Sequence, residues 1–378
     1  MIVKNGNVFC DDGIFREKDI RAENGIIVEI GDDLTHVGCE VVDAAGCYVI
    51  PGLIDIHTHG AMGADFSDGT SEAIEEIAKF QLSRGVTGFL GTTMALDKDR
   101  LSGICEITKP HVNKRYPARA VLYGIYLEGP FISEERRGAQ NPAYIQKPDY
   151  RLFESLYKES GDAIRIATVA PEIEGGLEFI KEAASLCNVS LAHSTADYNA
   201  AHDAFVAGAT HVTHLFNGMN PFGHREPGII GAAFDSGAYV EIIADGIHIH
   251  PSVIRAVFKL FGEDRVCLIS DSMRACGLTD GEYDLGGQMV TVVGRTATIE
   301  SGSIAGSVTT LADCMRNCVE FGIPLTKAIK AATINPAKSA GIDAVAGSLT
   351  VGKRADILVL CKELQFRNVV FDGVKKQS

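Results

Sequence analysis

Short runs of apolar, mostly branched residues recur through the middle of the chain, and stretches with helical periodicity lie between many of them. Runs of this kind are typical of parallel strands that are buried on both faces. We predict strands at 50–57, 87–94, 121–128, 164–170, 189–193, 211–217, 239–247 and 266–271. Helical patterns occupy, for example, 71–84, 173–186, 197–208 and 251–262. Eight strand–helix alternations over about 290 residues predict an α/β fold, a (β/α)8 TIM-like barrel.

Residues at the predicted helix ends agree with this alternation. Asp197 stands where it would N-cap one helix, and Pro251 lies in the first turn of another, where proline is tolerated. The main alternative is a doubly wound open sheet. That fold normally carries a Gly-rich phosphate-binding turn after its first strand, and none follows 50–57. We therefore favour the barrel.

Both ends of the chain show a different pattern, with short strand-like runs broken by Gly-containing turns. Because chain termini often lie close together, we expect 1–49 and 344–378 to form one small β-sandwich domain and 50–343 to form the barrel. A further β-like excursion is expected at 294–300. Residues 347–353 match the start of a P-loop, but Arg354 stands where that motif needs Ser or Thr. We therefore discount a nucleotide site.

Charge and composition narrow the classes of partner. The 378 residues carry 35 Lys and Arg against 49 Asp and Glu, a net charge of −14, which argues against nucleic acid as a partner. No apolar run approaches the roughly 20 residues that cross a bilayer, and no signal-peptide layout is visible. The ten cysteines form no Cys-x-x-Cys pair, which fits reduced thiols. We expect a cytoplasmic protein without membrane contact.

Polar side chains follow six of the eight predicted strands. The active site of a TIM barrel lies at the carboxyl ends of its strands, so these positions are candidate site residues. One such residue alone would more often be a hydrogen-bonded core side chain, but six strands with such ends form a specific pattern. In chain order the residues are His57 and His59, Glu128, His193, His214, His248 and Asp271.

These residues divide by their chemistry. His193, His214 and Glu128 offer two nitrogens and one oxygen, which suits a catalytic metal site with an open position. His57 and His59 lie two apart, so they point to the same face of a strand. With Asp271 they are candidates for a second metal site, bridged by Glu128. A metal lowers the pKa of bound water towards ~7, and Asp271 can take its proton and pass it to a leaving group.

Other polar residues receive structural or supporting assignments. A straight strand would point His211 away from His214, so we assign His211 to structure. Asp55 is expected to be a hydrogen-bonding support for the site. His250 is assigned to structure, and we give no role to His36, His111 and His202.

A third group of residues has the character of an anion site. Asn217-Gly218 and Arg225 lie in one predicted loop, where backbone amides and a guanidinium can hold a phosphate. The segment 302–306 precedes a helical pattern and can present amides in the same way. Arg225 taken alone would more often form a surface ion pair.

The motifs together resemble the amidohydrolase superfamily and, within it, the family of N-acetylglucosamine-6-phosphate deacetylases. The matching segments span almost the whole chain in order, and Leu-Glu-Gly-Pro and the Asn-Gly-Met…Arg-Glu-Pro-Gly loop are specific to this branch. The segments are 51–60, 127–131, 138–142, 170–172, 192–196, 213–219, 225–228, 244–248, 270–273 and 305–307.

The resemblance implies a barrel with a small β domain, and hydrolysis of N-acetyl-D-glucosamine 6-phosphate to D-glucosamine 6-phosphate and acetate. A metal-bound hydroxide would attack the amide carbonyl, with Asp271 as base and then acid. Glu128, His193 and His214 match the main metal ligands. One or two divalent ions per subunit are implied, zinc or iron first and manganese or cobalt next.

The resemblance also assigns the substrate pocket. The family's arginine comes from the partner subunit, so it implies a homodimer in which Arg225 reaches the partner's active site. The residues that match substrate-contacting positions are Ala139, Gln140, Asn217, Gly218, Arg225, His248, Ile304, Ala305 and Gly306.

Three alternatives stay open. A deacetylase for the galactosamine isomer cannot be separated from these motifs. A cyclic-amide hydrolase would commonly use a carboxylated lysine where this chain has Glu128. An inactive relative that acts as a scaffold would usually have lost ligands, and every expected ligand is present here.

Overall fold

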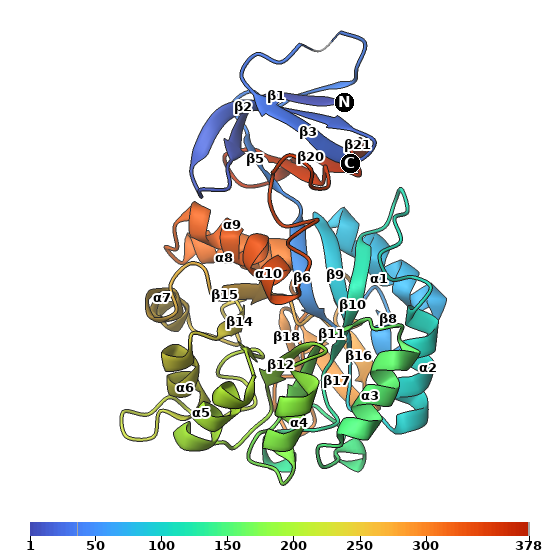
Figure 1. Ribbon diagram of the computed structural model, residues 1–378, viewed down its shortest axis with the longest axis vertical. Helices are drawn as coiled ribbons and strands as arrows, with labels where there is room; N and C mark the ends of the chain where they lie inside the picture. The colour runs from blue at the N-terminus through green and yellow to red at the C-terminus, as the bar shows by residue number, and fades with distance from the viewer. Residues whose placement is uncertain (36, 377–378) are drawn as a thin grey trace.

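A computed structural model describes residues 1–35 and 37–376, so His36 lies outside the described residues. The chain forms a barrel of parallel strands wrapped by helices, with a separate sheet built from both termini above it (Figure 1). The prediction of a TIM-like barrel with a terminal β unit is confirmed. The domain boundaries at 49/50 and 343/344 stay a prediction.

The barrel consists of eight strands that pair in parallel in chain order. A parallel bridge between Thr58 and Ser272 links the first strand to the segment after the last, which nearly closes the barrel. All residues of most of these strands are buried, which explains their continuous apolar runs. The strands are β6 (Leu53–Thr58), β9 (Val86–Thr93), β10 (Val121–Leu127), β11 (Ile164–Val169), β12 (Asn188–Leu191), β13 (His211–Val212), β14 (Tyr239–Ile243) and β15 (Val266–Ile269).

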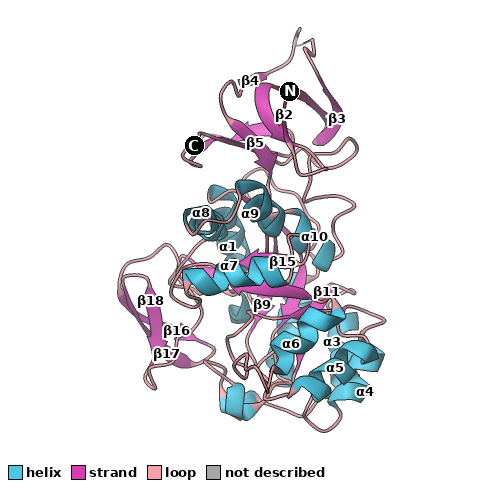
Figure 2. Cartoon of the chain, turned by 90° about the vertical axis from the view of Figure 1, so that its left-hand side faces the viewer, coloured by secondary structure: helices cyan, strands magenta, loops and turns pink. Residues whose placement is uncertain are grey.

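Helices follow the strands and cover the outside of the barrel (Figures 1 and 2). The predicted caps are confirmed: the Asp197 side chain accepts the amide of Ala200, and Pro251 is the first helical residue after His250. The α-helices are α1 (Ser71–Ser83), α2 (Lys98–Thr108), α3 (Tyr150–Glu159), α4 (Gly176–Ala183), α5 (Tyr198–Ala207), α6 (Gly228–Ser236), α7 (Pro251–Leu260), α8 (Leu311–Glu320), α9 (Leu325–Ala332) and α10 (Ile334–Ser339). None of the described helices has the length and apolar character needed to span a bilayer.

Both termini contribute to a second sheet of eight strands, which has its own buried core. Strand β5 pairs with β1 from the amino-terminal part and with β19 from the carboxy-terminal part, which joins the two ends of the chain. The strands are β1 (Ile2–Phe9), β2 (Phe15–Glu23), β3 (Ile26–Gly31), β4 (Val41–Asp43), β5 (Tyr48–Pro51), β19 (Ile357–Leu360), β20 (Phe366–Phe371) and β21 (Val374–Lys376).

Smaller elements lie at the edge of the barrel. The expected excursion at 294–300 belongs to a three-stranded antiparallel sheet that projects from one side of the barrel (Figure 2). Its strands are β16 (Gly281–Leu285), β17 (Gln288–Val293) and β18 (Thr296–Ile299). The short strands β7 (Gly60–Ala61) and β8 (Ala64–Asp65) and three single-turn helices, η1 (Phe66–Asp68), η2 (Glu134–Arg136) and η3 (Pro142–Tyr144), complete the described elements.

Two predicted strands differ from the observed ones for a physical reason. The predicted strand 50–57 is two strands, because β5 leaves for the terminal sheet and β6 begins the barrel. Gly52 lies between them, where a Cβ atom would be 2.1 Å from the Thr87 hydroxyl oxygen. The predicted strand 211–217 ends at Val212, because His214 and Phe216 have φ angles of 25° and 77° that no strand contains.

Candidate active site

A cavity of about 400 Å³ opens at the carboxyl ends of the barrel strands. Most of the predicted site residues line this cavity: His59, Glu128, Ala139, Gln140, His193, His214, Asn217, Gly218, His248, Asp271, Ile304 and Gly306. Three predicted residues do not. His57 lies beneath the cavity floor, Ala305 is fully buried, and Arg225 lies on the exposed loop after β13.

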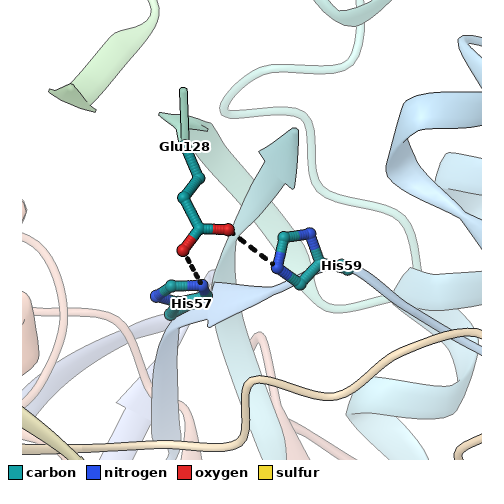
Figure 3. Close-up of side chains that lie close together, drawn as sticks. All are labelled: His57, His59 and Glu128. Carbon is teal, nitrogen blue, oxygen red and sulfur yellow. Dashed lines mark ion pairs between the residues drawn. The ribbon is translucent and has the colours of Figure 1, made fainter. Parts of the chain in front are cut away.

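One group of potential metal ligands joins the first and third strands. His57 in β6 and His59 just after it point towards the carboxylate of Glu128 (Figure 3). The Nε2 atoms of His57 and His59 lie 3.7 and 3.2 Å from the Glu128 carboxylate oxygens, and 3.5 and 3.3 Å from Asp271 Oδ1. Two imidazoles and two carboxylates therefore converge on one buried point.

A second group of potential ligands shares the same glutamate. His193 Nε2 and His214 Nε2 lie 3.2 and 2.9 Å from Glu128 Oε1, and 3.2 Å from each other. All three residues are buried. Glu128 thus stands between the two groups, each of its oxygens facing imidazole nitrogens.

The donor atoms in both groups fit a divalent cation. His193 donates its Nδ1 hydrogen to the carbonyl oxygen of Arg136 at 2.8 Å, so in the neutral ring Nε2 carries a lone pair. That lone pair faces a carboxylate oxygen and a second imidazole nitrogen, an arrangement that needs a positive charge between the atoms. His57 Nε2 is likewise buried without a hydrogen-bond partner and faces two carboxylates. His and carboxylate ligands of this kind suit zinc, iron, manganese or cobalt.

The pKa shifts of the clustered side chains also indicate that this site favours a positive charge. Burial lowers the pKa of His57, but the carboxylates of Glu241, Asp271 and Glu128 outweigh this and raise the pKa to about 9. Burial acts to raise the pKa of Glu128, yet the surrounding histidines hold it well below its ordinary value. A cation in this position would neutralise carboxylates that are already held ionised.

Asp271 lies where an acid–base group is needed. Burial acts to raise the pKa of its carboxyl, but His57 and His59 hold the pKa below its ordinary value, so the group is ionised at neutral pH. Asp271 lines the cavity, whereas the supporting Asp55 lies behind it and accepts hydrogen bonds from Ser270. The supporting role that we predicted for Asp55 agrees with this geometry.

The backbone turns sharply at three of the site residues. His193, His214 and Asp271 have φ angles of 45°, 25° and 47°, in or near the left-handed region that non-glycine residues rarely adopt. Each of them follows the end of a barrel strand, so the turn directs a side chain into the cavity. Strain of this kind costs about 1–3 kcal/mol per residue and persists where the surroundings fix it.

Glu241 in β14 supports both groups and is not among the residues predicted from the sequence. Its Oε2 accepts the Nδ1 hydrogen of His57 at 3.0 Å and the amide of His214 at 3.1 Å. Its Oε1 accepts the Nε2 hydrogen of His211 at 3.0 Å, and His211 Nδ1 accepts the Ser339 hydroxyl at 2.6 Å. The signal was available, because Tyr-Val-Glu-Ile-Ile places a charged residue inside an otherwise apolar strand.

The remaining histidines have structural contacts that agree with their assignments. His211 lies outside both ligand groups and contacts Glu241. His250 N-caps α7 by accepting the amide of Ser252. His202 lies in the middle of α5, and His111 contacts the Ser71 hydroxyl.

Asn217, Gly218 and His248 are candidate substrate contacts that line the cavity, whereas Arg225 does not line it. The His248 Nδ1 hydrogen is donated to Asp245 at 2.7 Å, which fixes the ring and leaves Nε2 available. Gly218 approaches His193 so closely that a Cβ atom would lie 2.8 Å from His193 Nδ1. The backbone amide of Asn217 donates to the His214 carbonyl, and its side-chain NH2 donates to the carbonyls of His214 and Leu215, so of this pair the Gly218 amide is the candidate contact.

Gln140, a predicted lining residue, donates to Glu128 at 2.9 Å and accepts the amide of Ala95. Other residues of the cavity lining were not predicted. The unpredicted residues include Arg136, which lies in a run of charged residues that reads as ordinary surface. They are Met94, Glu135, Arg136, Gly138, Phe216 and Leu285, whereas the lining residue Ser303 belongs to the predicted segment 302–306.

The chain is similar to known proteins along most of its length. The chain is 39% identical over 331 residues to the N-acetylglucosamine-6-phosphate deacetylase of Bacillus subtilis, covering 86% of this chain and 84% of that protein. It is 31% identical over 375 residues to the N-acetylgalactosamine-6-phosphate deacetylase of Escherichia coli O157:H7, covering 98% of both.

A solved structure is similar over the whole chain. The crystal structure of N-acetylglucosamine-6-phosphate deacetylase from Pasteurella multocida superposes with a TM-score of 0.93 at 26% identity, covering 100% of this chain and 99% of that one. The model of the amidohydrolase family matches residues 48–376, which include every candidate ligand. The chain belongs to the amidohydrolase family.

Proposed function

We propose that the protein is a metal-dependent hydrolase that removes the acetyl group from N-acetyl-D-glucosamine 6-phosphate, giving D-glucosamine 6-phosphate and acetate. The observation that carries the proposal is the convergence of four imidazoles on Glu128 beside the ionised Asp271, in a cavity next to candidate phosphate contacts. The similarity to deacetylases of phosphorylated amino sugars supplies the substrate class.

The ligand assignment follows from the two groups. Glu128, His193 and His214 would hold the principal ion, and His57, His59 and Asp271 would hold a second one with Glu128 between them. An ion bound there supplies a water with lowered pKa and polarises a carbonyl oxygen. Two ions per chain are expected, because both histidines of the first strand are present.

Asp271 performs the proton transfers in this proposal. Its carboxylate is ionised at neutral pH, so it can accept a proton from the attacking water. It then delivers that proton to the nitrogen of the departing amine. The amide bond breaks, acetate leaves with the water oxygen, and the sugar retains the amino group and its phosphate.

In this proposal the substrate phosphate lies near His248, Asn217 and Gly218, and Ala139, Gln140, Ile304 and Gly306 lie around the sugar, with the buried Ala305 behind the lining. Arg225 is exposed on the loop after β13, away from the cavity of its own chain. An exposed Arg225 is free to enter the cavity of a second copy. We therefore propose a homodimer in which each chain completes the partner's site.

The direct test is release of free amine from N-acetylglucosamine 6-phosphate, with unphosphorylated N-acetylglucosamine run beside it. The proposal expects rapid release that depends on the phosphate. Absence of release from a metal-loaded sample would contradict the substrate assignment. N-acetylgalactosamine 6-phosphate is the second candidate, since one relative carries that name and aligns along 98% of this chain. The ratio of kcat/KM for the two isomers decides between them.

A further inference from the structure

Arg136 is the feature of the cavity that the proposed function leaves unassigned. It lies in η2, in the loop between β10 and α3 that covers one side of the cavity. Among the described residues that line the cavity, it is the only arginine or lysine. Arg225, the other candidate cation, is exposed and does not line the cavity of its own chain.

The carboxylates of the cavity favour a fixed cation beside an anionic substrate, in addition to the ions proposed at Glu128. Glu128, Glu135 and Asp271 all line it, and the protein as a whole carries a net charge of −14. A phosphate dianion entering such a cavity is repelled unless a fixed positive charge lies close to it. The proposed ions would be held at Glu128 and Asp271, whereas Arg136 is the one arginine or lysine among the described lining residues and can place a positive charge at the phosphate.

The position of Arg136 places it next to the candidate phosphate contacts. Its carbonyl oxygen accepts the Nδ1 hydrogen of His193 at 2.8 Å, and it would lie 3.3 Å from a Cβ atom at Gly218. Its Nη2 donates to the Asn220 side chain at 2.6 Å, and Asn220 in turn donates to the Thr195 carbonyl. The guanidinium is therefore held against the loop that carries Asn217 and Gly218.

The guanidinium also has unused hydrogen-bonding capacity. Its Nε is buried and has no hydrogen-bond partner. Its nearest carboxylate is that of Glu135, at 3.8 Å, and the Glu135 side chain is 72% exposed to solvent. A planar guanidinium that is held in place by a neutral amide, with donors left over, is suited to a phosphate group.

We propose that Arg136 supplies, from the same chain, the fixed positive charge that binds the phosphate of the sugar and makes the site selective for phosphorylated substrates. This inference rests on the proposed function. It adds a cation from the same chain to the contacts assigned above, so phosphate recognition does not depend on the partner's Arg225 alone.

The test measures binding by calorimetry with glucosamine 6-phosphate and with glucosamine, neither of which has an amide to hydrolyse. Arg136→Gln is expected to weaken binding of the phosphorylated sugar about ten- to hundredfold, which is the range for a hydrogen bond to a charged group. Binding of glucosamine is expected to change less than about twofold. Arg136→Lys is expected to recover part of the loss, since it restores the charge without the planar fork.

Arg137→Gln is the matched control. Arg137 is the next residue, donates only to the Glu134 carbonyl among the described contacts, and does not line the cavity. Its replacement is expected to leave both affinities unchanged. Equal weakening of both sugars in Arg136→Gln would assign the residue to loop structure and overturn the proposal. Unchanged affinity for glucosamine 6-phosphate, or no phosphate-dependent binding to the unsubstituted protein, would also overturn it.

Turnover of N-acetylglucosamine 6-phosphate by the same samples separates this inference from the proposed function. Phosphate-dependent binding that Arg136→Gln weakens, without any turnover, supports the role of Arg136 and contradicts the deacetylase assignment. Turnover by a variant with unchanged phosphate affinity supports the deacetylase and overturns the role of Arg136.

Discussion

Glutamine in place of Glu241 is expected to weaken metal binding most strongly at the His57–His59 group. The carboxylate is fully buried and accepts three hydrogen bonds, from His57 Nδ1, His211 Nε2 and the amide of His214. A glutamine has one oxygen and one NH2 group in the same space. It therefore sets a donor against at least one of these donors.

The magnitude follows from the loss of that support. A carboxylate that orients a metal-bound histidine typically contributes 10- to 100-fold to metal affinity, which is about 1.4–2.7 kcal/mol. The ring of His57 depends on Glu241 through its side chain, whereas His214 contacts Glu241 only through its backbone amide. We therefore expect the larger loss at the His57–His59 group and a smaller one at the Glu128–His193–His214 group.

The assay is metal content per chain after equilibration with graded concentrations of a chelator. The unsubstituted protein is expected to lose its two ions at higher chelator concentrations than Glu241→Gln, which should retain chiefly one ion. Glu154→Gln is the control, because Glu154 forms an exposed ion pair with Lys158 on α3, far along the sequence from any candidate ligand. Retention of both ions by Glu241→Gln at the same chelator concentrations as the control would refute the reasoning.

Three further predictions follow from the site and its surroundings. Asp271→Asn is expected to abolish turnover while the ion held by Glu128, His193 and His214 stays bound, and normal turnover would exclude Asp271 as the acid–base group. Arg225→Ala is expected to raise KM for the phosphorylated sugar only, and its co-expression with Asp271→Asn should restore about a quarter of the activity if Arg225 acts in the partner's site. Burial acts to raise the pKa of Asp19, but hydrogen bonds with Asn5 and Lys4 help to hold that pKa below its ordinary value. The resulting stabilisation of the folded state is present above the unfolded pKa of about 3.9 and is lost as the pH falls through the folded pKa. Asp19→Asn should therefore have a lower free energy of unfolding at pH 7 in urea titrations, and its difference from the unsubstituted protein should shrink in acid.

The sequence predicted those site residues best that lie at the ends of recognisable strand patterns. His57 and His59 lie at the end of an apolar run, and with a spacing of two both rings face Glu128, one from the end of β6 and one from just beyond it. Glu128 and Asp271 likewise follow buried strands. The eight strands could be found because each is buried on both faces and is therefore mostly apolar, with only a few buried polar residues such as Asp55 and Glu241.

Other features depend on contacts between distant parts of the chain. The role of Glu241 depends on its contact with His57, which is 184 residues away in the sequence, and only the folded barrel brings the two side chains together. Arg136 is one of four consecutive charged residues, and its place on the cavity lining follows from how the loop folds back. The short β13 reflects the turn at His214, where tertiary contacts override the strand propensity of the Thr-His-Leu-Phe run.

The central claim is that metal held by the histidines around Glu128 is required for amide hydrolysis, and titration of metal-free protein tests it most directly. The protein would be stripped with a chelator and then titrated with zinc, iron, manganese or cobalt. Amine release from N-acetylglucosamine 6-phosphate would be followed at each step. We expect no turnover without metal and a rise that saturates between one and two equivalents per chain. Undiminished turnover by the metal-free protein would contradict the account.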